Sequence, residues 1–129
     1  MPIIYTIDHK ERLVLARAEG IITLKDIEDF SDDIVAQDAL AYRKLFDGTN
    51  AAGTYDDNDV MILAARASAY ATLTRRGRLA LVPRRNAVPD LAERYINLGK
   101  FEGRARVYRT REEALEWLNS PETESDSET

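Results

Sequence analysis

Five short apolar runs alternate with segments whose apolar residues recur at helical spacing, and this alternation limits the folds open to the chain. The runs cover residues 3–7, 12–19, 42–46, 79–83 and 105–109. They are rich in the β-branched and aromatic residues that strands favour. A four-residue turn joins the first two, and helical segments separate the others. The sequence predicts the order β-β-α-β-α-β-α-β-α, an α/β fold with a mixed, mostly parallel five-stranded sheet and helices packed on it.

Capping signals mark the expected helices. Thr23 precedes a helical pattern and has Asp26 three residues later, as in a capping box. A second helix is expected from about residue 58 to 74, where alanine is frequent. A third begins near residues 86–89 and stops at Gly99, and the sequence TREE (residues 110–113) opens a fourth. The last run before the third helix, LALVP, is continuously apolar, as in a strand buried on both faces.

Length and charge predict one domain, residues 1–119, followed by a tail. The chain has 129 residues, enough for a substantial core. Residues 120–129 contain no apolar side chain and are predicted to be an acidic, disordered tail. The net charge is −5, and four acidic residues of the tail account for most of it. A nearly neutral domain argues against general binding to nucleic acid.

Several classes of site are excluded or disfavoured by composition. The chain has no cysteine and one histidine, His9, which falls in the predicted hairpin turn. Disulfides and thiolate sites are therefore excluded, and a catalytic triad would have to use His9. No secretion signal or membrane span is recognised, because the longest apolar stretch is short and contains Arg66. We expect a cytoplasmic protein without cofactor or metal, and a poor candidate for an enzyme.

The segment LFDGTNAAGTYDDND (residues 45–59) is the most unusual part of the sequence. It imitates a phosphate-binding loop, but Thr54 stands where the lysine should be. It also imitates the D-x-D-G-T motif of haloacid-dehalogenase phosphatases, but Leu45 occupies the nucleophile position. The aspartates lack the spacing of a calcium loop, so they are interpreted as caps of the following helix.

The order of elements and this loop resemble the STAS domain, the fold of anti-sigma factor antagonists (SpoIIAA-like superfamily). In that family an aspartate ends the third strand, and a D-S-[ST] motif leads into the second helix, where the serine is phosphorylated. Asp47 matches the strand-end aspartate, and residues 55–58 (YDDN) fall on the motif. Asp57 stands at the serine, so the phosphorylation switch is not expected. The resemblance implies a divergent, stand-alone regulatory domain that binds a protein partner.

Ligands of open α/β sheets collect at the carboxyl ends of parallel strands. The third strand is expected to end at Asp47 and the fourth near residue 83. The candidate partner- or ligand-binding residues are Asp47, Thr49, Thr54, Tyr55, Asp56, Asp57, Arg84 and Arg85. Adjacent arginines at the start of a helix can hold a carboxylate or a phosphate. Arg75, Arg76 and Arg78 precede the fourth strand and are expected at the opposite edge. Each arginine is otherwise expected to be a solvated surface charge.

Three functions compete on these observations. In the first, residues 47–59 and the apolar start of the second helix form a non-enzymatic surface for a protein partner. In the second, the domain binds a small anionic or lipid-like molecule at the strand ends. An unrecognised enzyme is the third and weakest alternative. The second helix is apolar beyond one stripe, which is interpreted as burial, with a homodimer contact as the alternative. An apolar pocket with convergent cations would favour the small ligand.

Overall fold

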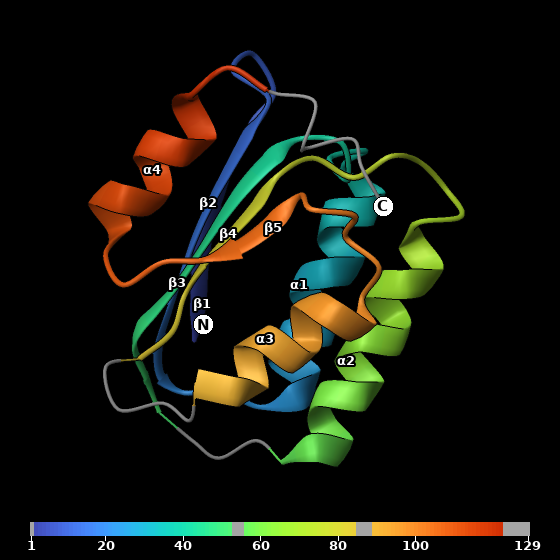
Figure 1. Ribbon diagram of the computed structural model, residues 1–129, viewed down its shortest axis with the longest axis vertical. Helices are drawn as coiled ribbons and strands as arrows, with labels where there is room; N and C mark the ends of the chain where they lie inside the picture. Colours follow the sequence, from blue (N-terminus) through green and yellow to red (C-terminus); the bar gives the residue numbers. More distant parts are fainter. Residues whose placement is uncertain (1, 53–55, 85–88, 123–129) are drawn as a thin grey trace.

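The computed structural model describes residues 2–52, 56–84 and 89–122, and it has nine elements of secondary structure (Figure 1). The strands are β1 (Ile3–Asp8), β2 (Leu13–Ile21), β3 (Arg43–Ala52), β4 (Leu79–Val82) and β5 (Ala105–Val107). The helices are α1 (Leu24–Ala36), α2 (Asp57–Tyr70), α3 (Pro89–Leu98) and α4 (Arg111–Asn119). The element order predicted from the sequence is confirmed.

The five strands form one sheet in the order β1-β2-β3-β4-β5. β1 pairs with β2 in antiparallel fashion, and the other neighbours pair in parallel. The predicted mixed, mostly parallel sheet is therefore confirmed. β3 lies in the middle of the sheet, where a strand has partners on both sides and helices over both faces.

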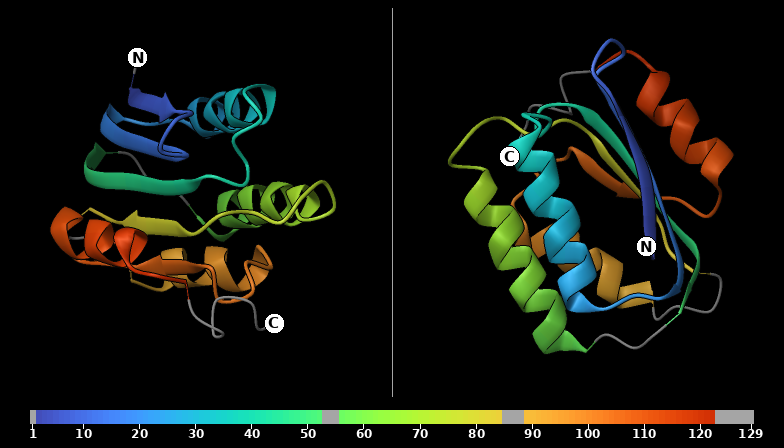
Figure 2. Two further views of the ribbon diagram at one scale, coloured as in Figure 1. Left: turned by 90° about the horizontal axis from the view of Figure 1, so that it is seen from above. Right: turned by 180° about the vertical axis from the view of Figure 1, so that it is seen from behind.

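The helices cover the sheet unevenly. α1, α2 and α3 lie on one face, and α4 lies alone on the other (Figures 1 and 2). Side chains alternate between the faces along each strand. Leu45 of β3 packs with Trp117 and Leu118 of α4, whereas Phe46 packs with Phe30 of α1. Lys44 has the same orientation as Phe46, so a lysine of the central strand faces the three-helix side.

The helix starts follow the capping signals of the sequence. The Thr23 hydroxyl accepts a hydrogen bond from the Asp26 amide, and the Asp26 carboxylate accepts one from the Thr23 amide. This reciprocal pair is the predicted capping box of α1. At α4, the Thr110 hydroxyl likewise accepts from the Glu113 amide. Each cap satisfies a backbone donor that the helix leaves unpaired, which fixes where the helix begins.

β3 extends further than the sequence predicts, and this corrects the place of the expected loop. The strand continues through residues 47–52, because the end of β2 runs beside it and pairs Glu19 with Asn50 and Ile21 with Ala52. The ladder offered by β2 outweighs the weak strand preference of glycine and asparagine. Asp47 is therefore an internal residue of β3 and does not mark its end.

Three arginines are buried, contrary to the expectation that arginines here are solvated. Arg76, Arg78 and Arg104 are less than a tenth exposed. The Arg78 guanidinium donates to the carbonyls of Trp117, Ser120 and Pro121 at the end of α4. Arg104 pairs with Glu122 at 2.6 Å. Guanidinium groups tolerate such sites because several of their donors can meet carbonyl or carboxylate oxygens at once.

The same contacts involve the first residues of the segment that the sequence assigns to the tail. Ser120, Pro121 and Glu122 receive hydrogen bonds from Arg78 and Arg104. Residues 123–129 lie outside the described residues. A truncation that is meant to leave the domain intact should therefore begin after Glu122.

Candidate functional site

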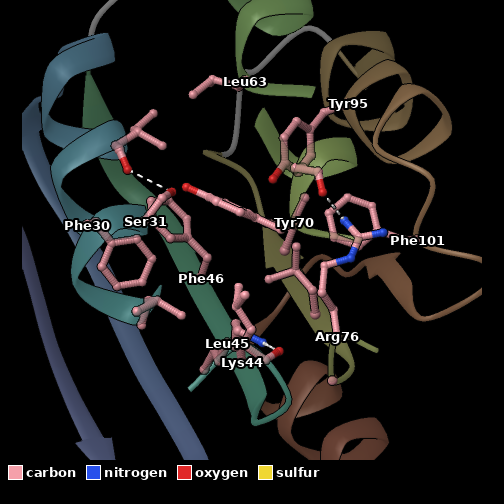
Figure 3. Close-up of a pocket in the computed structure, with 17 residues that line it drawn as sticks. Phe30, Ser31, Lys44, Leu45, Phe46, Leu63, Tyr70, Arg76, Tyr95 and Phe101 are labelled. Atoms are coloured by element: carbon pink, nitrogen blue, oxygen red, sulfur yellow. Dashed lines mark hydrogen bonds between the residues drawn. The ribbon is translucent and has the colours of Figure 1, made fainter. Parts of the chain in front are cut away.

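A pocket of about 220 Å³ lies between the sheet and the helices α1, α2 and α3, which cover one face of the sheet (Figure 3). α1 contributes Ile27, Phe30, Ser31 and Ile34, and α2 contributes Leu63, Ala67 and Tyr70. The sheet contributes Lys44, Leu45, Phe46, Leu79 and Leu81, and Tyr95 and Phe101 complete the far wall. The wall is therefore almost entirely aliphatic and aromatic, which is the usual character of a small-molecule site.

The composition of α2 explains why there is space beneath it. Leu63, Ala67 and Tyr70 lie at helical spacing and line the pocket. Alanine fills little volume at the position where a larger side chain would reach the sheet. Arg66 holds α2 beside α1 through Glu28 at 3.2 Å and Asp32 at 2.6 Å. The helix is thus fixed over the sheet without filling the space below it.

Lys44 contributes an amino group to this apolar wall. Its Nζ donates hydrogen bonds to the carbonyl oxygens of Leu40 at 2.5 Å and Tyr42 at 2.7 Å. In the part of the chain that the structure describes, no carboxylate lies within ion-pair distance of it. Burial, with the positive charges of Arg76 and Arg104, lowers the pKa of Lys44 to about 7.

Arg76 supplies a second cation near the pocket. Its guanidinium lies 4.1 Å from the centre of the Phe101 ring and donates to the carbonyls of Ala67 and Lys100. Figure 3 shows it beside Tyr95 and Phe101, on the side away from α1. The group joins the end of α2 to the segment after α3, and burial lowers its pKa. Its contacts indicate a structural role at the wall of the pocket.

Three hydroxyl groups also line the pocket. The Ser31 hydroxyl donates to the Ile27 carbonyl at 3.0 Å, and the Tyr70 hydroxyl accepts from Arg66 at 3.1 Å. The Tyr95 hydroxyl has no hydrogen-bond partner among the residues described. Burial raises the pKa of Tyr95 to about 12, so the hydroxyl stays protonated at neutral pH. It is therefore a donor available to a molecule in the pocket.

The residues predicted as a site are not gathered in this pocket. Asp47 accepts hydrogen bonds from the Thr49 amide and hydroxyl, and Arg111 of α4 lies 3.8 Å from it. Asp47 therefore faces the α4 side of the sheet, opposite the pocket. Arg84 follows β4 and does not line the pocket. Thr54, Tyr55 and Arg85 were also predicted, and they lie outside the described residues.

Asp56 and Asp57 stand at the start of α2, where the sequence places helix caps. The Asp56 carboxylate accepts from the Asp59 amide, and the Asp59 carboxylate accepts from the Asp56 amide. Asp57 is the first residue of the helix and lies 3.4 Å from Arg94 of α3. A capping box accounts for Asp56 without any ligand.

Replacement of the cap tests this assignment. We expect Asp56→Ala to lower the free energy of unfolding by about 1 kcal/mol, because the Asp59 amide loses its acceptor. Asp57→Ala is the matched control and should cost less, since exposed ion pairs contribute little. Urea denaturation of both variants measures the difference. Equal losses would contradict a capping role that is specific to Asp56.

The sequence contains a signal for the pocket that lies outside its conspicuous loop. Leu45 belongs to a central strand and is buried on one face, so Lys44 and Phe46 must share the other. A parallel sheet of this kind is covered on both faces. The run KLF therefore predicts a lysine under a helix layer, a position where lysine is rarely found without a reason.

Comparison of the sequence with models of known protein families and with curated protein sequences finds no match. Within the described ranges, no cluster of three or more histidine or carboxylate side chains is arranged to hold a metal ion. Of the helices in that same part of the chain, none has the length and apolar character that a membrane crossing requires.

Proposed function

We propose that this domain binds a small, largely apolar molecule in the pocket between the sheet and α1, α2 and α3. The observation that carries the proposal is the aliphatic and aromatic wall of the cavity, interrupted by few polar groups. A cavity of about 150 Å³ with such a wall admits benzene in an engineered protein core. The pocket here is about 220 Å³ and offers room for a somewhat larger molecule.

The polar groups of the wall limit the chemistry of the ligand. The Tyr95 hydroxyl is a donor that a bound oxygen atom would meet, and the Lys44 amino group is a second polar group in the wall. The apolar body of the ligand would lie against Phe30, Phe46 and Leu63. These features support an alkyl or aryl compound with one oxygen-containing group. They do not favour a highly charged ligand, since burying a charged group against an apolar wall is costly unless it finds an ionic partner and hydrogen bonds.

Titration with hexan-1-ol tests the proposal. We expect binding with a Kd on the order of 0.1 mM, or about 5.5 kcal/mol, which is within the ceiling for so small a ligand. Leu63→Trp should weaken binding at least about tenfold, because the indole would occupy the pocket. Ala65→Trp, on the exposed part of the same helix, is the matched control and should bind as the wild type does. Calorimetry measures both, and equal binding by the two variants would overturn the proposal.

A second candidate function rests on a different surface. We infer that a STAS-like domain of this kind would contact a protein through the start of α2. Met61 and Ile62 are 56% and 39% exposed there, next to Asp56 and Asp57. Exposed apolar side chains rimmed by charges support a protein contact. The mixed sheet and the order of elements agree with the STAS resemblance, and Asp57 at the expected serine leaves the phosphorylation switch without an acceptor.

Native mass spectrometry of the protein purified from its own host distinguishes the two candidates. A retained small molecule supports the pocket. A second subunit or a bound protein supports the α2 surface, provided that the double variant Met61→Lys, Ile62→Lys loses it. A bare single chain from both the wild type and the double variant would contradict the interaction function.

A further inference from the structure

We propose that Lys44 is a nucleophilic lysine that forms an imine with an aldehyde or ketone bound in the pocket. The inference rests on the proposed function, since it names the chemical class of the ligand and the atom that holds it. A lysine that forms an imine must be partly neutral, close to its carbonyl partner and shielded from bulk water. Lys44 is half-buried and lines the pocket, where a bound carbonyl compound would lie within its reach.

The hydrogen bonds of Lys44 are compatible with a neutral amine. A neutral amino group has two N–H donors and one lone pair, whereas an ammonium group has three donors. Among the described residues, Nζ donates to two acceptors, the carbonyl oxygens of Leu40 and Tyr42. Both hydrogens of the neutral amine are thereby used, and its lone pair remains available. Figure 3 shows Lys44 at the base of the pocket, with a hydrogen bond from its amino group drawn as a dashed line.

The surrounding charges also favour the neutral form. The charged groups that act on Lys44 are Arg76 and Arg104, and both are cationic. Among the pocket residues, α2 brings only Tyr70 as a titratable group and α3 only Tyr95, while α1 brings the hydroxyl of Ser31. None of these is a carboxylate. A desolvated lysine beside other cations is the usual arrangement of an imine-forming residue.

The step is a condensation that needs no oxidant or reductant. The lone pair of Nζ attacks the carbonyl carbon, forming a C–N bond while the C=O π electrons move to oxygen. A proton passes from nitrogen to that oxygen to give a carbinolamine. Loss of water then forms the C=N bond, so that one carbonyl compound and one amine give one imine and one water. The Tyr95 hydroxyl is a further donor in the wall.

The other lysines provide an internal comparison. The chain has four lysines, and Lys10, Lys25 and Lys100 are exposed. At pH 7 an ordinary lysine is neutral in less than one molecule in about a thousand. Lys44, with its pKa lowered to about 7, is neutral in roughly half of the molecules. The lower basicity of the nitrogen offsets part of this gain, so an advantage of at least about tenfold in rate is expected.

Reductive trapping tests the inference on the full chain. The protein is treated at pH 7 with hexanal and sodium cyanoborohydride, which reduces an imine to a stable secondary amine, and is then mapped by peptide mass spectrometry. We expect Lys44 to be alkylated at least about tenfold faster than any exposed lysine. Excess hexan-1-ol and the Leu63→Trp variant should each slow this reaction. Lys44→Arg, which removes the primary amine but keeps a cation at this position, should trap no aldehyde there.

The outcomes separate this inference from the binding function. If hexan-1-ol binds and Lys44 reacts no faster than Lys10, Lys25 and Lys100, the imine is excluded and the pocket remains. If Lys44 reacts first but neither hexan-1-ol nor Leu63→Trp slows it, the amine acts outside a ligand pocket, and both proposals fail. If hexan-1-ol does not bind and Lys44 shows no preference, both fail as well. The rate for Lys44 should also rise with pH around a midpoint near 7.

Discussion

Gly77→Ala is expected to destabilise the domain by about 3 kcal/mol or more. A Cβ atom at residue 77 would lie 2.5 Å from the Ala41 carbonyl oxygen and 2.5 Å from the Tyr42 carbonyl carbon, with the Tyr42 oxygen closer still. These are backbone atoms, so no side-chain rotation relieves the clash. The Gly77 amide also donates to the Leu40 carbonyl at 3.0 Å, which fixes the two segments against each other.

Gly48→Ala is the matched control for this prediction. Its Cβ would lie 3.2 Å from the Val82 carbonyl oxygen, a tight contact that a shift of a few tenths of an ångström relieves. A loss of about 1 kcal/mol is expected, at the lower end of the range for overpacking. Thermal unfolding followed by circular dichroism measures both variants. Similar stabilities for the two would mean that residues 41–42 move away from residue 77 at little cost.

The clash at residue 77 also bears on the pocket. The carbonyls of Leu40 and Tyr42 hold the Lys44 amino group, and the same turn packs on Gly77. A displaced turn would move both acceptors of Lys44. A Gly77→Ala protein that still folds should therefore lose the selective trapping of hexanal as well as stability. The close packing of one glycine and the chemistry of one lysine depend on the same three-residue turn.

The layout of the fold follows from local patterns in the sequence. The capping pairs Thr23–Asp26 and Asp56–Asp59 fix two helix starts through hydrogen bonds that span three residues. Apolar runs bounded by turn residues mark the strands in the same local way. The length of β3 is not determined by its local sequence. Residues 47–52 become strand only because β2 extends beside them, and that neighbour is about thirty residues away in the sequence.

The candidate site was harder to predict, because the conspicuous residues are not the ones that line the pocket. The aspartates of residues 56–59 attract attention by composition, yet a capping box explains two of them. The pocket exists because the side chains between α2 and the sheet do not fill the space there, and no sequence motif marks such a space. Alternation in the run KLF would have directed attention to Lys44. Distances between α2 and the sheet, which decide whether space remains, arise only from tertiary packing.

Lys44→Met is expected to stabilise the domain at neutral pH by about 2 kcal/mol, in contrast to most substitutions in a protein interior. Methionine fills a similar length without a group that must be desolvated. The Leu40 carbonyl keeps a hydrogen bond from Gly77 in the variant. The Tyr42 carbonyl loses the hydrogen bond that Lys44 donates to it, and this loss offsets part of the gain in stability. A stabilising substitution at a pocket residue would indicate that the lysine is retained at a cost in stability.

The pH dependence gives the sharper test. The pKa of Lys44 is about 7 in the folded chain, against an ordinary value near 10.5 in the unfolded chain. Between these values the unfolded state binds the additional proton, so the wild type gains stability as pH rises, by up to about 1.4 kcal/mol per pH unit. Below pH 7 both states are protonated and the full cost of burial is present. The advantage of Lys44→Met should thus be greatest at pH 6 and shrink towards pH 9.

The titration of two tyrosines limits the pH range that is useful for this experiment. The pKa values of Tyr5 and Tyr95 are raised to about 12, so the unfolded state loses their protons first above pH 10 and the folded state weakens there. Both tyrosines are present in the variant and in the wild type, so their contribution cancels in the difference. Urea denaturation at pH 6, 7.5 and 9 measures that difference. A constant difference across these values would mean that Lys44 stays protonated in the folded chain, and the neutral amine required for imine formation would be lost with it.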